Sequence, residues 1–184
     1  SDVCSSDLIF TILSSCASRQ LEEVTFRRAT ISVPELMATA GKYFRKVYKG
    51  NKAHIDFKIQ PLEGRITGDW NQLRFLLENL IDEACSVTLD GAVCLSARED
   101  GEFIRFLFTD MRREKTREEL NQLFYPDLSR MTAGEKGELY GTEYLVCKQI
   151  IRDHDEFAGR RGCRINAEPG KEGGFTIYFT LPKK

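Results

Sequence analysis

The sequence predicts an α/β (α+β) fold, a two-layer sandwich in which helices cover one face of a mixed sheet. Three observations support this prediction. Strands that alternate apolar and polar residues come as neighbours around short turns. Amphipathic helices separate these strand pairs, as in sheets that are covered on one side. The length of 184 residues, with 41% hydrophobic and 30% charged content, suits one globular domain, alone or with a remnant of its neighbour.

Composition excludes several classes of protein. Lys and Arg total 27 against 28 Asp and Glu, a net charge of -1, so no large electrostatic term favours nucleic acid or an anionic membrane as a partner. The longest apolar stretch, residues 8–13, is too short to span a bilayer. The cysteines form no C-x-x-C pair and no metal-ligand spacing, which predicts a reducing, cytoplasmic environment, whether or not the parent protein is anchored in a membrane. They are Cys4, Cys16, Cys85, Cys94, Cys147 and Cys163.

The chain divides into three parts. Residues 1–8 resemble a translated sequencing adapter, with a genuine polar segment as the alternative. Residues 9–29 contain no Gly or Pro and predict a helix that ends near Arg27 and Arg28, the stump of an upstream dimerisation-type element. Residues 30–184 form the main domain.

The first half of this domain predicts two helices and two short strands. Ser32 is expected as the N-cap of a helix that reaches about Val47. Strands are expected at residues 55–59 and 65–67. A second, longer helix from Asp69 to about Thr88 has one apolar stripe at i, i+3, i+4 and i+7 spacing. The stripe consists of Leu73, Leu76, Leu77, Leu80, Ile81, Ala84 and Val87.

The second half begins with a hairpin of strands 92–98 and 103–109 around a turn that contains Gly101. A polar, basic stretch follows, with a short helix expected at residues 116–124. A helix at residues 142–154 comes next, and a charged connection at 155–162, to which we assign no function, leads onward. The chain then closes with strands at residues 163–167 and 174–181.

The segment from Gly68 to Ala84 resembles the N box of the GHKL superfamily, which comprises histidine kinases, gyrase, mismatch-repair ATPases and heat-shock chaperones. The resemblance implies a Bergerat-type ATP-binding fold, with Asn79 as the residue that helps to bind Mg²⁺ on the phosphates. Glu83 stands where the kinases have a second Asn. The two residues are four apart and share one ridge of the helix, and their oxygens are suitable Mg²⁺ donors. The alternative is that both are polar residues on a solvated helix face.

Four further elements in the same order extend the resemblance over about residues 31–182. Asp110 resembles the adenine-binding Asp of the Asp-x-Gly-x-Gly box. Residues 116–124 resemble the phenylalanine box, and residues 141–154 resemble the Gly-x-Gly-Leu helix that ends in a His. Residues 174–182 resemble the closing strand. The nucleotide-binding residues that the resemblance implies are Asn79, Glu83, Asp110, Gly141 and Thr142, with Asn79 at the metal and no catalytic residue.

The chain departs from the family pattern at the glycines. Arg112 and Glu114 occupy the two Gly positions after Asp110, and Glu143 occupies the second Gly position of the later box. Those glycines let the backbone approach a nucleotide without a Cβ in the way. A carboxylate at Glu143 also competes with phosphate for the helix start. The basic residues from Arg112 to Arg117 are expected either to pair with phosphates or to form a solvated loop.

These features favour a degenerate histidine-kinase-like module of a bacterial signalling protein, similar to kinase-like domains of unknown function from Bacteroidetes. It would act as a pseudokinase-like regulatory or interaction module, with weak or absent binding of ATP and Mg²⁺. Expected partners are the upstream helices of the same protein, a second copy, or a response-regulator-type protein of a two-component system. The alternative is an active catalytic domain that phosphorylates a His outside this fragment, since His54 and His154 lack the phosphoacceptor context. A third reading, an anti-sigma-type Ser kinase, is disfavoured because Phe75 stands where a base is needed.

Overall fold

The computed structural model describes residues 25–125 and 142–184. The expectations for residues 1–8, and for the helix up to residue 24, lie outside this part of the chain. Within it, residues 25–28 have no helix and lead into strand β1 (Ala29–Ser32), so the prediction that the helix continues to Arg28 is wrong. The physical reason is tertiary pairing. β1 runs antiparallel to β3 (Arg65–Gly68), and this pairing brings together Ile31 and Ile66, which are both buried.

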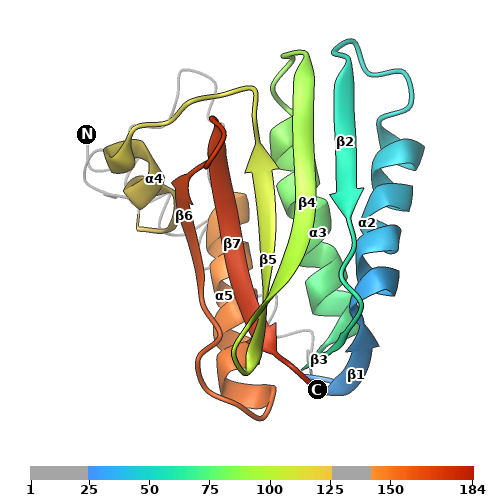
Figure 1. The fold of residues 1–184 in the computed structure, drawn as a ribbon, viewed down its shortest axis with the longest axis vertical. Helices are drawn as coiled ribbons and strands as arrows, with labels where there is room; N and C mark the ends of the chain where they lie inside the picture. The colour runs from blue at the N-terminus through green and yellow to red at the C-terminus, as the bar shows by residue number, and fades with distance from the viewer. Residues whose placement is uncertain (1–24, 126–141) are drawn as a thin grey trace, which may run out of the picture.

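A five-stranded sheet forms one layer of the molecule, in the order β2-β4-β5-β7-β6 (Figure 1). β2 pairs with β4 in parallel, and every other neighbouring pair in this sheet is antiparallel, which confirms the predicted mixed sheet. The strands are β2 (Ile55–Gln60), β4 (Gly91–Asp100), β5 (Phe103–Asp110), β6 (Ile165–Pro169) and β7 (Phe175–Pro182).

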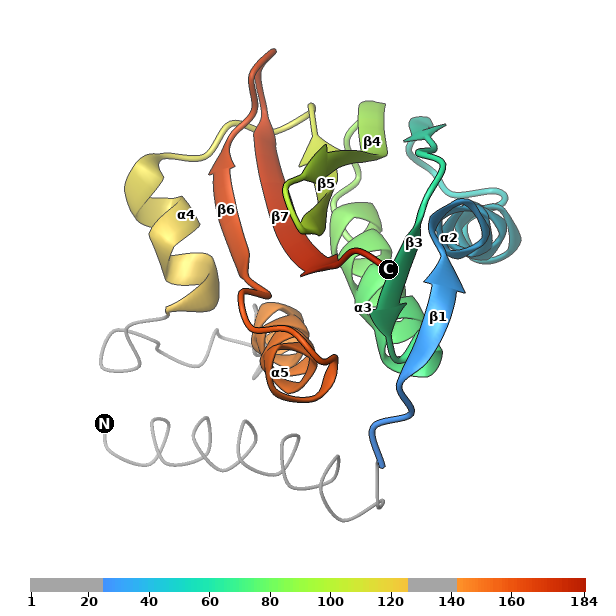
Figure 2. The same ribbon diagram turned by 60° about the horizontal axis from the view of Figure 1, so that its bottom comes forward.

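Three helices form the second layer on one face of this sheet (Figures 1 and 2). They are α2 (Val33–Val47), α3 (Trp70–Cys85) and α5 (Thr142–Phe157), with α3 between the other two. The short helix α4 (Arg117–Phe124) lies beside β6 at the sheet edge. The predicted two-layer α/β sandwich with helices on one face is therefore confirmed.

The helix starts follow their local signals. Ser32 caps α2 by accepting a hydrogen bond from the Glu35 amide, and Thr116 caps α4 through the Glu119 amide. Six of the seven predicted stripe residues of α3 are buried, but the helix ends at Cys85 and Val87 lies beyond it, half-buried. The hairpin of β4 and β5 turns at Gly101, whose φ of +61° suits glycine.

The end of α5 differs from its prediction. The helix continues past His154 to Phe157, and the Ala158 amide still donates to the His154 carbonyl. The connection that follows is a closed turn, because the Asp155 carboxylate accepts from the amides of Gly162 and Cys163. Residues 163 and 164 precede β6, which begins at Ile165.

Candidate functional site

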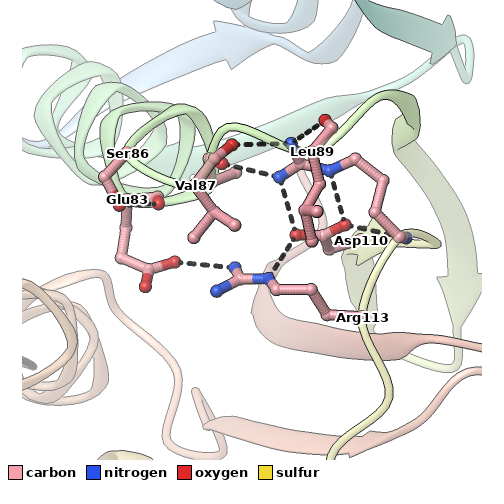
Figure 3. A network of polar contacts seen from close by, with 8 residues as sticks. Glu83, Ser86, Val87, Leu89, Asp110 and Arg113 are labelled. Atoms are coloured by element: carbon pink, nitrogen blue, oxygen red, sulfur yellow. Dashed lines mark hydrogen bonds and ion pairs between the residues drawn. The ribbon is translucent and has the colours of Figure 1, made fainter. Parts of the chain in front are cut away.

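Asp110, the last residue of β5, is at the centre of a buried polar network (Figure 3). Its side chain is 1% exposed. Oδ1 accepts hydrogen bonds from the backbone amide and from Nε of Arg112, both at 3.0 Å. Oδ2 accepts from Nη2 of Arg112 at 2.9 Å and from Nε of Arg113 at 3.0 Å. An ionised carboxylate has about four acceptor positions, so all of them are occupied by the protein's own donors.

Arg112 links this carboxylate to the C-terminal end of α3. Nη1 donates to the carbonyls of Val87 at 3.1 Å and Leu89 at 2.8 Å. Nη2 donates to the carbonyl of Ala84 at 2.6 Å as well as to Asp110. With Nε also on Asp110, all five N–H groups of the guanidinium have an acceptor. The side chain is 1% exposed, so it is neither part of a solvated loop nor directed at a phosphate site.

Arg113 extends the network to α5. Its Nη2 lies 3.3 Å from Glu83 Oε2, and its guanidinium lies over the Phe175 ring, 5.3 Å from the centroid. Glu83 in turn is hydrogen-bonded to the hydroxyl of Tyr144, a buried residue in the first turns of α5. The ends of β5 and α3 are therefore connected to the beginning of α5 through four residues, Asp110, Arg113, Glu83 and Tyr144.

The charges of the network set the pKa of its central group. Burial alone would raise the pKa of Asp110, but hydrogen bonds and the positive charge of Arg112, with the charge of Arg113, outweigh it. The net result is a pKa below the usual value, so Asp110 is ionised and acts only as an acceptor. For Arg113, burial lowers the pKa, and the neighbouring Glu83 and Asp110 raise it by more.

The N-box residues Asn79 and Glu83 lie on one ridge of α3, as the sequence predicted. The amide nitrogen of Asn79 is buried and has no hydrogen-bond partner among the described residues, whereas Glu83 is engaged by Arg113 and Tyr144. Over the described residues, no group of three or more His, Cys, Asp or Glu side chains is arranged to hold a metal ion. In this arrangement Arg113 pairs with Oε2 of Glu83, and the four acceptor positions of Asp110 are occupied by Arg112 and Arg113.

The remaining predicted site residues belong to the start of α5. Gly141 and the side chain of Thr142 lie outside the described part of the chain, and Thr142 is the first residue of α5. Glu143 follows in the first turn of the helix, half-buried. Glu114, at the other replaced glycine, accepts a hydrogen bond from the Gly174 amide at 2.9 Å and so fastens the loop after β5 to β7.

The opposite end of α3 has a second buried polar cluster. The Asp69 side chain accepts from the Gln72 amide at 3.1 Å and from the Arg27 amide at 2.8 Å. The Asp69 amide donates to Nε2 of His154 at 3.0 Å, and Nδ1 of His154 lies 2.8 Å from the Ile150 carbonyl. Nε2 is therefore an acceptor and Nδ1 carries the proton. Phe26 packs edge-on against the imidazole, with 4.8 Å between ring centroids.

The sequence did not reveal the roles of Arg112, Arg113 and Tyr144. The expectation for the two arginines was either pairing with phosphates or a solvated loop, and Tyr144 was not singled out. Nothing in the local sequence signals that Arg112 binds carbonyls 23 to 28 positions earlier in the chain. The one available signal is the substitution itself. Arg112 stands where the family has glycine, and a buried arginine needs hydrogen-bond acceptors.

Comparison with known proteins identifies the family. The model described as histidine kinase-, DNA gyrase B-, and HSP90-like ATPase matches residues 68–184. The adaptive-response sensory kinase SasA of Thermosynechococcus vestitus is 30% identical over 138 residues, which are 73% of this chain and 34% of SasA. The chain thus spans about a third of the length of this curated relative.

Solved structures match the fold. The catalytic domain of histidine kinase ThkA superposes with a TM-score of 0.65 at 19% identity, covering 85% of this chain and 96% of that domain. Acinetobacter baumannii histidine kinase AdeS gives 0.65 at 13% identity, covering 94% and 76%. ThkA in complex with the response regulator TrrA gives 0.68 at 18% identity, covering 96% and 47%. No helix among residues 25–125 and 142–184 is long and apolar enough to cross a membrane.

Proposed function

The chain belongs to the family of histidine kinase-, DNA gyrase B-, and HSP90-like ATPases, and we propose that it is a degenerate member whose nucleotide binding is weak or absent. It serves as a regulatory or interaction module in a bacterial signal-transduction protein. Its function then depends on the surfaces that it offers to the upstream helices of its own protein, to a second copy or to a response-regulator-type partner. ThkA, a fold relative, has been solved in complex with the response regulator TrrA.

One observation supports the proposal most directly, namely the saturation of Asp110 by Arg112 and Arg113. A ligand amino group would have to displace the Arg112 guanidinium, which makes two hydrogen bonds to Asp110 and three to backbone carbonyls. Such displacement leaves buried charges unpaired, which is strongly unfavourable. Glu83 is engaged to a lesser extent, by Arg113 and Tyr144, so both acidic residues that the resemblance places in the pocket have partners within the protein.

A calorimetric titration with ATP, with and without Mg²⁺, tests the proposal. We expect no binding in the low micromolar range, and a Kd of about 1 μM, which corresponds to about -8 kcal/mol, would contradict it. The matched variant is Glu143→Gly, which removes one negative charge from the helix start and leaves Asp110 and its arginines in place. If the arginines on Asp110 prevent nucleotide binding, Glu143→Gly alone should not restore it. The triple variant Arg112→Gly, Glu114→Gly, Glu143→Gly should gain affinity, more for ATP than for adenosine.

The alternative function is an active domain that binds ATP·Mg²⁺ and phosphorylates a His outside the fragment. The side-chain amide nitrogen of Asn79, which has no partner among the described residues, favours it. Buried amides in folded proteins usually have a hydrogen-bond partner, and a bound ligand could supply one here. Tight ATP binding that requires Mg²⁺ and is lost in Asn79→Ala would support this second function. Neither function predicts phosphate on His154, which is fully buried.

A further inference from the structure

A cationic stripe lies at the C-terminal end of α2, the helix on the opposite side of α3 from α5 (Figures 1 and 2). Lys42, Arg45 and Lys46 are spaced at i, i+3 and i+4 and share one face of α2, and Lys49 lies in the turn that follows the helix. All four are exposed. No Asp or Glu occurs between Glu35 and Asp56, although acids and bases are nearly balanced over the whole chain.

None of the four stripe cations is neutralised by a neighbour within residues 25–125 and 142–184. They take no part in the ion pairs or side-chain hydrogen bonds there, and no further polar contact involves them. Like charges at i, i+3 and i+4 repel one another. The helix dipole at the C-terminal end of α2 offsets part of this repulsion, but its effect is confined to the last turn, so it does not account for Lys42.

The stripe borders a hollow with a rigid aromatic floor. An open cavity of about 650 Å³ is lined by the four cations together with Phe44 and Tyr48. The two rings are stacked with 6.0 Å between centroids. The Tyr48 hydroxyl donates to Asp82 of α3 at 2.6 Å, and this bond holds the floor in place. The hollow thus combines a fixed apolar base with positive charge in its lining.

We propose that this hollow is a docking surface for an acidic segment of a partner protein. Its lining offers cations to carboxylates and an aromatic floor to an apolar side chain between them. The cations gather within residues 42–49, a span that suits a short acidic segment better than an extended bilayer surface. The net charge of -1 provides no long-range attraction for a nucleic acid, whereas a docked acidic segment needs only the local field. The surface is separate from the Asp110 network, so it does not depend on whether the domain binds nucleotide.

The test uses a fluorescent octaglutamate peptide and the full chain. We expect binding to the wild type that weakens as salt rises from about 20 to about 150 mM. Lys42→Gln, Lys46→Gln and Lys49→Gln together should lower affinity at least about tenfold. Glutamine keeps the helix propensity, so this variant should fold. The matched control, Arg98→Gln, Arg152→Gln and Lys171→Gln, removes three exposed cations elsewhere and should leave the affinity within about twofold.

Two further probes decide the class of partner. Phosphatidylserine vesicles and a single-stranded oligonucleotide are titrated under the same conditions. We expect both to bind more weakly than the peptide, and any binding to be shared by the stripe variant. Tighter binding of either probe, lost in the stripe variant, would overturn the proposal in favour of that class. Absence of peptide binding at low salt, or equal losses in the stripe and control variants, would overturn it altogether.

Discussion

The two ends of α3 are both held by buried polar clusters, but the clusters are built differently. At the N-terminal end, Asp69 caps its own helix, and most of its partners are backbone amides together with the neutral ring of His154. At the C-terminal end, Arg112 reaches back from the loop after β5 to the Ala84, Val87 and Leu89 carbonyls. Each end matches the sign of the helix dipole, with an anion at the start and a cation at the end.

The difference shows at which end of α3 the fold depends on paired charged side chains. The N-terminal cluster contains one carboxylate, which accepts from backbone amides, and a neutral imidazole. The C-terminal cluster is a charged network in which two arginines and two carboxylates depend on one another. Loss of one partner from such a network leaves a buried charge behind, whereas loss of a single cap leaves unpaired backbone groups. The C-terminal end should therefore be the more sensitive of the two to substitution.

The largest effect is expected for Arg112→Met. The variant removes the principal partner of Asp110 and uncovers three carbonyls, so the free energy of unfolding should fall by about 3–5 kcal/mol. Chemical denaturation measures it. Arg112→Lys is the matched control, because it keeps the positive charge but has no planar fork. We expect it to recover only part of the loss. A loss below about 1 kcal/mol for Arg112→Met would show that the network does not stabilise the domain.

A smaller effect is expected for His154→Phe at the other end of α3. Phenylalanine preserves the packing against Phe26, but the Asp69 amide loses its acceptor in a buried site. Such a loss costs about 1–3 kcal/mol. Thermal and chemical denaturation should give the same ranking, with Arg112→Met more destabilised than His154→Phe. The reverse ranking would break the comparison between the two ends.

The same comparison explains what could be predicted from the sequence. The start of α3 at Asp69 and its apolar stripe follow local rules with fixed offsets. The predicted start is confirmed, with Asp69 as the N-cap, and six of the seven predicted stripe residues are buried in the helix. The placement of Arg112 depends on the hairpin of β4 and β5, which brings its loop beside a helix end some 25 residues earlier in the chain. No periodic rule encodes that approach. The helix expected to reach Arg28 failed for a similar reason, because pairing of β1 with β3 overrode local propensity.

Removal of the cap itself should cost less. Asp69→Ala takes an acceptor from the Gln72 and Arg27 amides, and N-cap losses are typically about 1 kcal/mol, within about 0.5–2. Asp69→Asn keeps one side-chain oxygen, which can accept from only one of the two amides, so it should recover part of the stability. Hydrogen exchange of the amides in the first turn of α3 would locate the effect. Faster exchange throughout α3 in Asp69→Ala, equal to that in Arg112→Met, would mean that the two ends are not independent.

The smallest effect is expected in the pH dependence, where the size of the stability loss in acid reports how Asp110 is paired. In the wild type the folded-state pKa of Asp110 lies below its unfolded value of 3.8. Its contribution to stability is therefore complete above about pH 4 and is lost as pH falls through the lower, folded pKa.

In Arg112→Met the side-chain hydrogen bonds and the charge of Arg112 are gone, whereas the amide of residue 112 and Arg113 still lower the pKa of Asp110 and burial still raises it. The acid loss from Asp110 should then be smaller than in the wild type. Denaturation of both proteins at about pH 6 and about pH 3 gives the difference, because the folded-state pKa of Asp155 is also lowered, but equally in each. Identical slopes in the two proteins would mean that Arg112 does not set the charge state of Asp110.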